Sequence, residues 1–146
     1  MPDLKNTEEI ISHYKKVIFP LESLVKVANG STGSKMSITI NVKGITISGY
    51  LVALDEFHEY TSDTILENVR KVSDAETFQN MQTIMNAMKD MYAKPELCDL
   101  VNSYVCIKNP SYHIYAIDGK DKYTIEGSFW IGKIESVDGF TIGMPD

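Results

Sequence analysis

The sequence predicts an α+β fold: a strongly bent antiparallel β-sheet or small β-barrel built from two hairpins, with an N-terminal helix and a helical insertion in the middle. Apolar and polar residues alternate in two stretches, about 36–54 and 127–144, as in strands with one covered face. Apolar residues between about 55 and 94 recur every three or four positions, as in helices. With 146 residues, 43% of them apolar, we expect a single domain over residues 1–146.

The N-terminal helix is expected at about residues 6–19. Asn6 can accept from the free amides of a first turn, and Glu9 can complete a capping box. Pro20 disfavours helical geometry at Phe19, so we place the end of the helix there. The apolar positions that should form its buried face are Ile10, Ile11, Tyr14, Val17 and Ile18.

The first hairpin is the clearest local prediction, because a two-residue turn at Lys43-Gly44 brings both alternating strands into register. The apolar pairs that this register places on one face are Val42/Ile45, Ile40/Ile47, Ile38/Gly49 and Met36/Leu51. Gly49 interrupts that face, and a strand glycine often permits a bend or a close backbone approach.

The helical insertion is expected to contain two helices. Residues 55–70 are acidic, with a few apolar anchors. A capping box at Ser73–Glu76 then opens a firmer helix that continues toward Pro95.

The remaining sheet region, about 103–144, is predicted to contain short strands separated by turns. We expect strands at 104–108 and 112–117, a turn at Asn109-Pro110-Ser111, and a polar turn at 118–121. A second hairpin follows if Val137-Asp138-Gly139 forms a three-residue loop with Gly139 left-handed. Ile134 would then lie opposite Ile142.

Neither a catalytic motif nor a cofactor motif is found. The one histidine among carboxylates is in the cluster Asp55, His58 and Glu59, which would share a helix face. A metal or acid/base site there is the weaker reading, because no second histidine lies at ligand spacing. We therefore expect a protein that is not an enzyme and needs no cofactor or metal. Cys98 and Cys106 have no ligand-like surroundings and are interpreted as reduced thiols.

A protein interface is the preferred interpretation of the apolar residues that exceed the needs of a small core. Four methionines fall within eleven residues of one predicted helix, and thioether side chains adapt to varied partners. The candidate interface residues are Met81, Met85, Met88, Met91, Trp130 and Phe140. Core filling is the commoner role of methionines at helical spacing and of a single tryptophan, so we expect only some of these side chains at an interface. We expect self-association, most simply as a homodimer.

Charge and hydropathy indicate which classes of partner and which location to expect. The net charge is −6, and the basic residues are scattered, so we expect no nucleic-acid binding. Apolar runs are far shorter than a membrane span, and residues 1–6 do not resemble a secretory signal. We therefore expect no membrane partner and a cytoplasmic location.

Two groups of segments resemble the gas vesicle accessory proteins of the U type. The N-terminal group is Leu24–Gly30 (LVKVANG), Ile38–Gly44 (ITINVKG) and Ile47–Leu51 (ISGYL). The C-terminal group is Tyr104–Asn109 (YVCIKN), Trp130–Ile134 (WIGKI) and Val137–Gly143 (VDGFTIG). The resemblance implies a non-catalytic accessory or adaptor protein that acts in gas vesicle assembly, organisation or clustering through protein–protein contacts. The alternatives are a small-barrel module that binds another protein or a nucleic acid and, less favoured, a metal-dependent enzyme at Asp55, His58 and Glu59.

Overall fold

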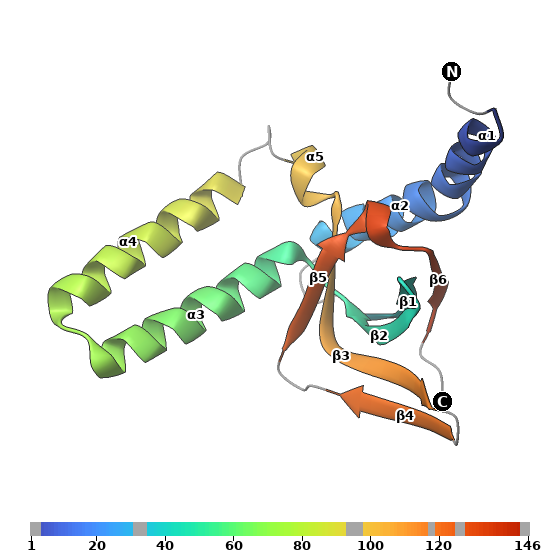
Figure 1. Ribbon diagram of the computed structural model, residues 1–146. Coiled ribbons are helices and arrows are strands. Elements are labelled where there is room, and N and C mark those ends of the chain that lie inside the picture. Colours follow the sequence, from blue (N-terminus) through green and yellow to red (C-terminus); the bar gives the residue numbers. More distant parts are fainter. Residues whose placement is uncertain (1–3, 31–34, 93–97, 117–118, 125–127, 144–146) are drawn as a thin grey trace. The chain divides into compact units, whose positions relative to one another are not determined.

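The computed structural model describes residues 4–30, 35–92, 98–116, 119–124 and 128–143. Contacts divide the chain into two compact units (Figure 1). The first, here called the sheet unit, contains Met1–Ala53 and Asn102–Asp146, and the second, the helical unit, contains Leu54–Val101. Helices and an antiparallel sheet occupy separate parts of the sequence, which confirms the predicted α+β class.

The N-terminal helix is longer than predicted and does not stop at Pro20. It runs as α1 (Leu4–His13), a π-helical turn (Tyr14–Ile18) and α2 (Phe19–Asn29). In the wider turn the Phe19 amide donates to the Tyr14 carbonyl five residues back. Pro20, which lacks an N–H group, then lies in the first turn of α2, a position that proline tolerates. The predicted start was also late, because Asn6 lies inside α1.

The first hairpin is confirmed, with the predicted turn and register. Its strands are β1 (Met36–Val42) and β2 (Ile45–Leu51). The paired residues are Met36/Leu51, Ser37/Tyr50, Ile38/Gly49, Thr39/Ser48, Ile40/Ile47, Asn41/Thr46 and Val42/Ile45. Lys43 and Gly44 both have positive φ, at 50° and 82°, as the tight turn requires.

The close approach expected at Gly49 is also present. A Cβ atom on Gly49 would lie 2.8 Å from the Lys108 carbonyl oxygen and would clash with the Ile107 side chain. The register between β2 and its next neighbour shifts at the same point, between Ser48 and Tyr50. Gly49 therefore allows the paired strand to approach the backbone of β2 closely at this irregularity.

The region after residue 103 begins with one long strand rather than two short ones. β3 (Tyr104–Ala116) continues through Asn109-Pro110-Ser111, where a turn was predicted, and Asn109 takes a left-handed φ of 54°. The irregularity is thus absorbed as a distortion within the strand. β3 pairs with β4 (Gly119–Thr124), so Gly119 to Asp121 are strand and not turn, while Asp118 lies outside the described residues.

The predicted second hairpin is wrong. β5 (Phe129–Lys133) pairs with β3, and β6 (Gly139–Ile142) pairs with β1, so Ile142 lies opposite Ile38 instead of Ile134. Gly127 and Met144, the outer ends of that prediction, lie outside the described residues. Gly139 does not have positive φ.

Hydrogen bonds explain why the last strand leaves β5 for β1. Between β5 and β6 the chain forms a 3-10 turn (Ile134–Ser136), and Ile134 and Val137 are buried in the core. The Asp138 carboxylate then accepts from the Lys43 amide at 2.8 Å, and the Asp138 amide donates to the Asn41 carbonyl at 2.8 Å. These bonds join the start of β6 to the turn of the first hairpin.

The strands form one six-stranded antiparallel sheet in the order β4-β3-β2-β1-β6, with β5 also paired to β3. Among the described strands no pairing closes this sheet into a barrel, so the bent-sheet alternative is the correct one. A single cluster beneath it joins α2 to β1, β2, β3 and the 3-10 turn. Its buried members are Leu21, Val25, Ala28, Ile38, Ile40, Ile47, Leu51, Val105, Ile107, Ile134 and Val137.

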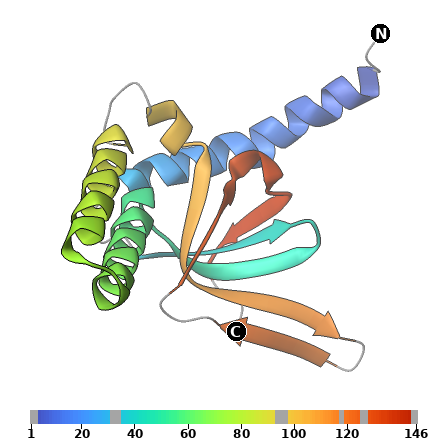
Figure 2. The same ribbon diagram turned by 60° about the vertical axis from the view of Figure 1, so that its left-hand side comes forward.

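The helical unit confirms the predicted helical insertion. It contains α3 (Leu54–Val72), α4 (Ala75–Tyr92) and the short α5 (Cys98–Val101). Asp74, not Ser73, caps α4, since its carboxylate accepts from the Thr77 amide at 2.8 Å. This bond from the Thr77 backbone amide, and to a smaller extent a hydrogen bond from the Thr77 side chain, lower the pKa of Asp74. Figure 2 shows α3 and α4 as an antiparallel pair.

Candidate interaction surfaces

The methionines of α4 divide into two groups. Met81 and Met85 are half-buried, and the Ser62 hydroxyl of α3 donates to the Met85 sulfur at 3.6 Å. Near the other end of the pair, the Arg70 guanidinium lies 4.9 Å from the centre of the Phe78 ring. These contacts join α3 to α4, so Met85 mainly fills the space between the two helices. Met81 lies one turn earlier on the same side of α4.

The remaining methionines are exposed. Ile84, Met88 and Met91 follow at spacings of four and three residues, with 53%, 39% and 45% of their surface accessible. This spacing places the three side chains along one side of α4. We call Ile84, Met88 and Met91 the methionine surface.

Trp130 and Phe140 lie against the core instead of standing free. Both side chains are half-buried and pack against the buried cluster of the sheet unit. The Trp130 ring covers Gly132, where an added Cβ would lie 2.5 Å from the ring. Each residue therefore has a packing role, and their participation in an interface stays a prediction.

The acidic cluster of α3 does not assemble into a metal site. Asp55 and Glu59 are exposed and His58 is half-buried. Burial lowers the pKa of His58, and the Asp55 carboxylate opposes that shift in part. Among the residues that the structure describes, no group of three or more His, Cys, Asp or Glu side chains could hold a metal ion.

One polar pair in the structure was not predicted from the sequence. The Ser48 hydroxyl lies 2.8 Å from Nε2 of His113, although the two residues are 65 positions apart. This is the distance between a nucleophile and its base in hydrolytic enzymes. Ser48 is only 1% exposed, however, so its oxygen is not accessible to a substrate. The pair connects β2 to β3, and only the pairing of these strands brings it together.

The apolar face predicted for the N-terminal helix is only partly covered. Val17 and Ile18 pack against the core. Ile10 is 68% exposed, and Ile11 and Tyr14 are each 49% exposed. These values contradict the expectation that the whole face is buried. Phe19 is also exposed, with its ring centre 6.3 Å from that of Tyr14. We call Ile10, Ile11, Tyr14 and Phe19 the N-terminal apolar face.

A groove of about 780 Å³ runs beside this helix. Its apolar wall contains Ile10, Tyr14 and Ile18. The other lining residues are polar, namely Asn6, Glu9, His13, Glu22 and Glu135.

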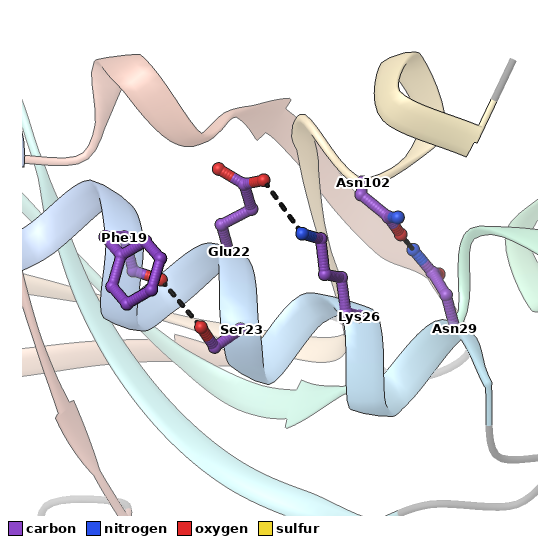
Figure 3. Close-up of polar contacts among 6 residues, drawn as sticks. All are labelled: Phe19, Glu22, Ser23, Lys26, Asn29 and Asn102. Atoms are coloured by element: carbon purple, nitrogen blue, oxygen red, sulfur yellow. Dashed lines mark hydrogen bonds and ion pairs between the residues drawn. The ribbon is translucent and has the colours of Figure 1, made fainter.

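The following helix, α2, has polar contacts within itself and one to another segment of the sheet unit (Figure 3). Near its C-terminal end the Asn29 amide nitrogen donates to the Asn102 side-chain oxygen at 2.8 Å. Lys26 pairs with Glu22 at 3.3 Å, and the Ser23 hydroxyl donates to the Phe19 carbonyl at 3.0 Å. With Leu21, Val25 and Ala28 in the core, α2 is fixed to the sheet, while Ile10, Ile11 and Tyr14 farther toward the N-terminus are exposed.

Cys106 is a buried free thiol, as predicted for a reduced cysteine, and the side chain of Cys98 lies outside the described residues. None of the described helices is both long enough and apolar enough to span a membrane.

Fold and surfaces together define an α+β protein with a packed antiparallel sheet and exposed apolar residues on two helical segments. Residues 19–145 match the model of the family described as gas vesicle protein GvpU-like. The chain therefore belongs to this family, and it is a gas-vesicle-related protein. No significant match to a curated protein or to a solved structure accompanies this one.

Proposed function

We propose that this protein is a non-catalytic accessory protein of the cytoplasm that acts in gas vesicle assembly, organisation or clustering by binding other proteins. The methionine surface is the proposed contact with a gas vesicle protein. The observation that carries the proposal is the family match over residues 19–145, and the exposed side chains of α4 supply a place for the contact.

The composition of the methionine surface supports a binding role. Ile84, Met88 and Met91 give α4 an apolar stripe on an exposed side, and methionine adapts its shape to a partner at little cost. Within the helical unit, Met81 and Met85 already occupy the side joined to α3. Ile84, Met88 and Met91 are therefore available for a second protein.

Co-flotation with purified gas vesicles tests the proposal, because gas-filled particles rise during centrifugation and carry bound protein with them. The wild-type protein is expected to float with the vesicles. The variant Met88→Glu/Met91→Glu is expected to remain in the liquid below, since two carboxylates in a contact surface oppose its desolvation.

The control is Val72→Glu, which places one such carboxylate on an 84%-exposed apolar residue at the end of α3. This variant should float like the wild type. Failure of the wild type to float, or equal flotation of the double variant, would refute the proposed contact. Circular dichroism of each variant distinguishes loss of binding from loss of the helices.

A further inference from the structure

The N-terminal helix carries an apolar face that nothing in the described part of the chain covers. Ile10 is 68% exposed, and Ile11 and Tyr14 are each 49% exposed. Single exposed apolar residues are common on protein surfaces, but three within five positions of one helix form a continuous patch. The patch precedes residue 19, where the family match begins, so the family assignment does not account for it.

Charged residues stand before and after this patch in the sequence. Glu8 and Glu9 precede it, and Lys15 and Lys16 follow it. At about 100° per residue, Glu8 and Lys15 lie at one edge of the apolar side, whereas Glu9 and Lys16 lie away from it. The patch therefore has a carboxylate near one end and an ammonium group near the other.

All four charged side chains are exposed, and among the described residues no intrachain ion pair involves them. An identical helix that runs in the opposite direction would bring its basic end to the acidic end of the first. Its apolar centre would lie on the apolar centre of the first. Such two-fold pairing requires a self-complementary surface, and the apolar centre with Glu8 before it and Lys15 after it supplies one.

The groove beside the helix is also lined by apolar and acidic side chains. Its apolar wall is Ile10, Tyr14 and Ile18, and carboxylates of Glu9, Glu22 and Glu135 also line it. Lys26 pairs with Glu22, whereas Glu9 and Glu135 have no ion pair within the described residues. These carboxylates add negative charge beside the apolar face, which favours a partner helix that carries basic residues.

We infer that two copies of this chain associate through antiparallel contact of their N-terminal helices, with Ile10, Ile11 and Tyr14 in the centre and Glu8 of each copy facing Lys15 of the other. This surface differs from the methionine surface proposed for a gas vesicle protein. One protein molecule can then bind a second copy and a different partner at the same time. The dimer places two methionine surfaces in one particle.

Charge exchange between two variants of the full chain tests the inference. The first variant is Lys15→Glu/Lys16→Glu, whose helix is acidic at both ends, and the second is Glu8→Lys/Glu9→Lys, whose helix is basic at both ends. Each alone should remain near the monomer mass of 16.4 kDa over a concentration series in light scattering. An equimolar mixture should recover a dimer, because opposite charges again face each other.

The wild type should show a mass that rises toward twice 16.4 kDa with concentration, and added salt should weaken its association. The control Met88→Glu/Met91→Glu should associate like the wild type, so the dimer and the vesicle contact can fail independently. A wild type that stays monomeric at every concentration would overturn the inference, even if it binds another protein. Dimerisation of either charge variant alone, or no dimer in the mixture, would also overturn it. Circular dichroism of the variants verifies that α1 remains folded.

Discussion

The sheet unit and the helical unit use apolar residues in different ways. In the sheet unit α2, three strands and a 3-10 turn enclose eleven buried side chains in one cluster. In the helical unit Leu54 is the only buried residue among those whose burial is described in α3 and α4. Both regions show clear apolar periodicity in the sequence, so periodicity identifies the apolar side of an element without showing whether that side is covered.

The reason for the difference is the number of elements that meet. A helix packed on a sheet is covered along most of its apolar stripe, as Leu21, Val25 and Ala28 show. Two paired helices cover each other along one line only, and side chains beside that line remain exposed. The buried cluster of the sheet unit therefore concentrates stability, whereas the helical unit leaves most of its apolar side chains partly or fully exposed.

The largest difference between the units should appear when one apolar side chain is truncated in each. Leu21→Ala should lower the free energy of unfolding by about 2–5 kcal/mol, because Leu21 is fully buried and its removal leaves a cavity. Ile84→Ala should change it by about 0.5 kcal/mol or less, since Ile84 is 53% exposed. Urea denaturation of the two variants measures both values. Equal losses would mean that Ile84 is covered in solution, and the contrast between the units would fail.

A second, smaller effect should locate the tightest packing within the sheet unit. Gly49→Ala should cost about 1–3 kcal/mol, since the new Cβ would lie 2.8 Å from the Lys108 carbonyl and would clash with Ile107. Gly139→Ala is the matched control, because an added Cβ meets nothing within 4 Å there. Thermal denaturation compares the pair. If Gly49→Ala has the same melting temperature as the wild type, β3 does not approach the backbone of β2 as closely as the structure shows.

The smallest effect is expected in the helical unit and depends on pH. Burial lowers the pKa of His58 from its ordinary value of 6.5, and Asp55 offsets part of the change. As the pH falls through 6.5, the unfolded state binds a proton before the folded state does, so stability declines from there to the folded pKa. Above pH 6.5 the imidazole is neutral in both states, and His58 causes no loss of stability.

Hydrogen exchange of the α3 amides at several pH values measures the decline locally. The variant His58→Gln has no imidazole and should lack this part of the pH dependence. An unchanged decline in the variant would assign the effect to another group. A wild type whose exchange free energy does not change between neutral and mildly acidic pH would contradict the lowered pKa.

Features that depend on neighbouring residues could be predicted from the sequence. The first hairpin is an example, because alternation and the Lys43-Gly44 turn act within sixteen residues and fix the register before any other strand is present. The need for close approach at Gly49 followed from the same strand pattern. The helices of the insertion followed from spacing and capping residues, with an error of one position at Asp74. The exposed positions of Met88 and Met91 could be suspected only because the methionines outnumbered the needs of one stripe.

Tertiary structure decided the pairing of strands distant in sequence. Alternation marks residues 139–142 as a strand but does not choose its partner, and the bonds from Asp138 to Asn41 and Lys43 direct it to β1 instead of β5. The pair Ser48 and His113 likewise forms only because β2 lies beside β3. Exposure of Ile10, Ile11 and Tyr14 was unpredictable for a similar reason. The helical period defines an apolar face through local geometry, whereas coverage of that face depends on which other elements reach it, and in the described structure the core contacts begin only at Val17 and Ile18.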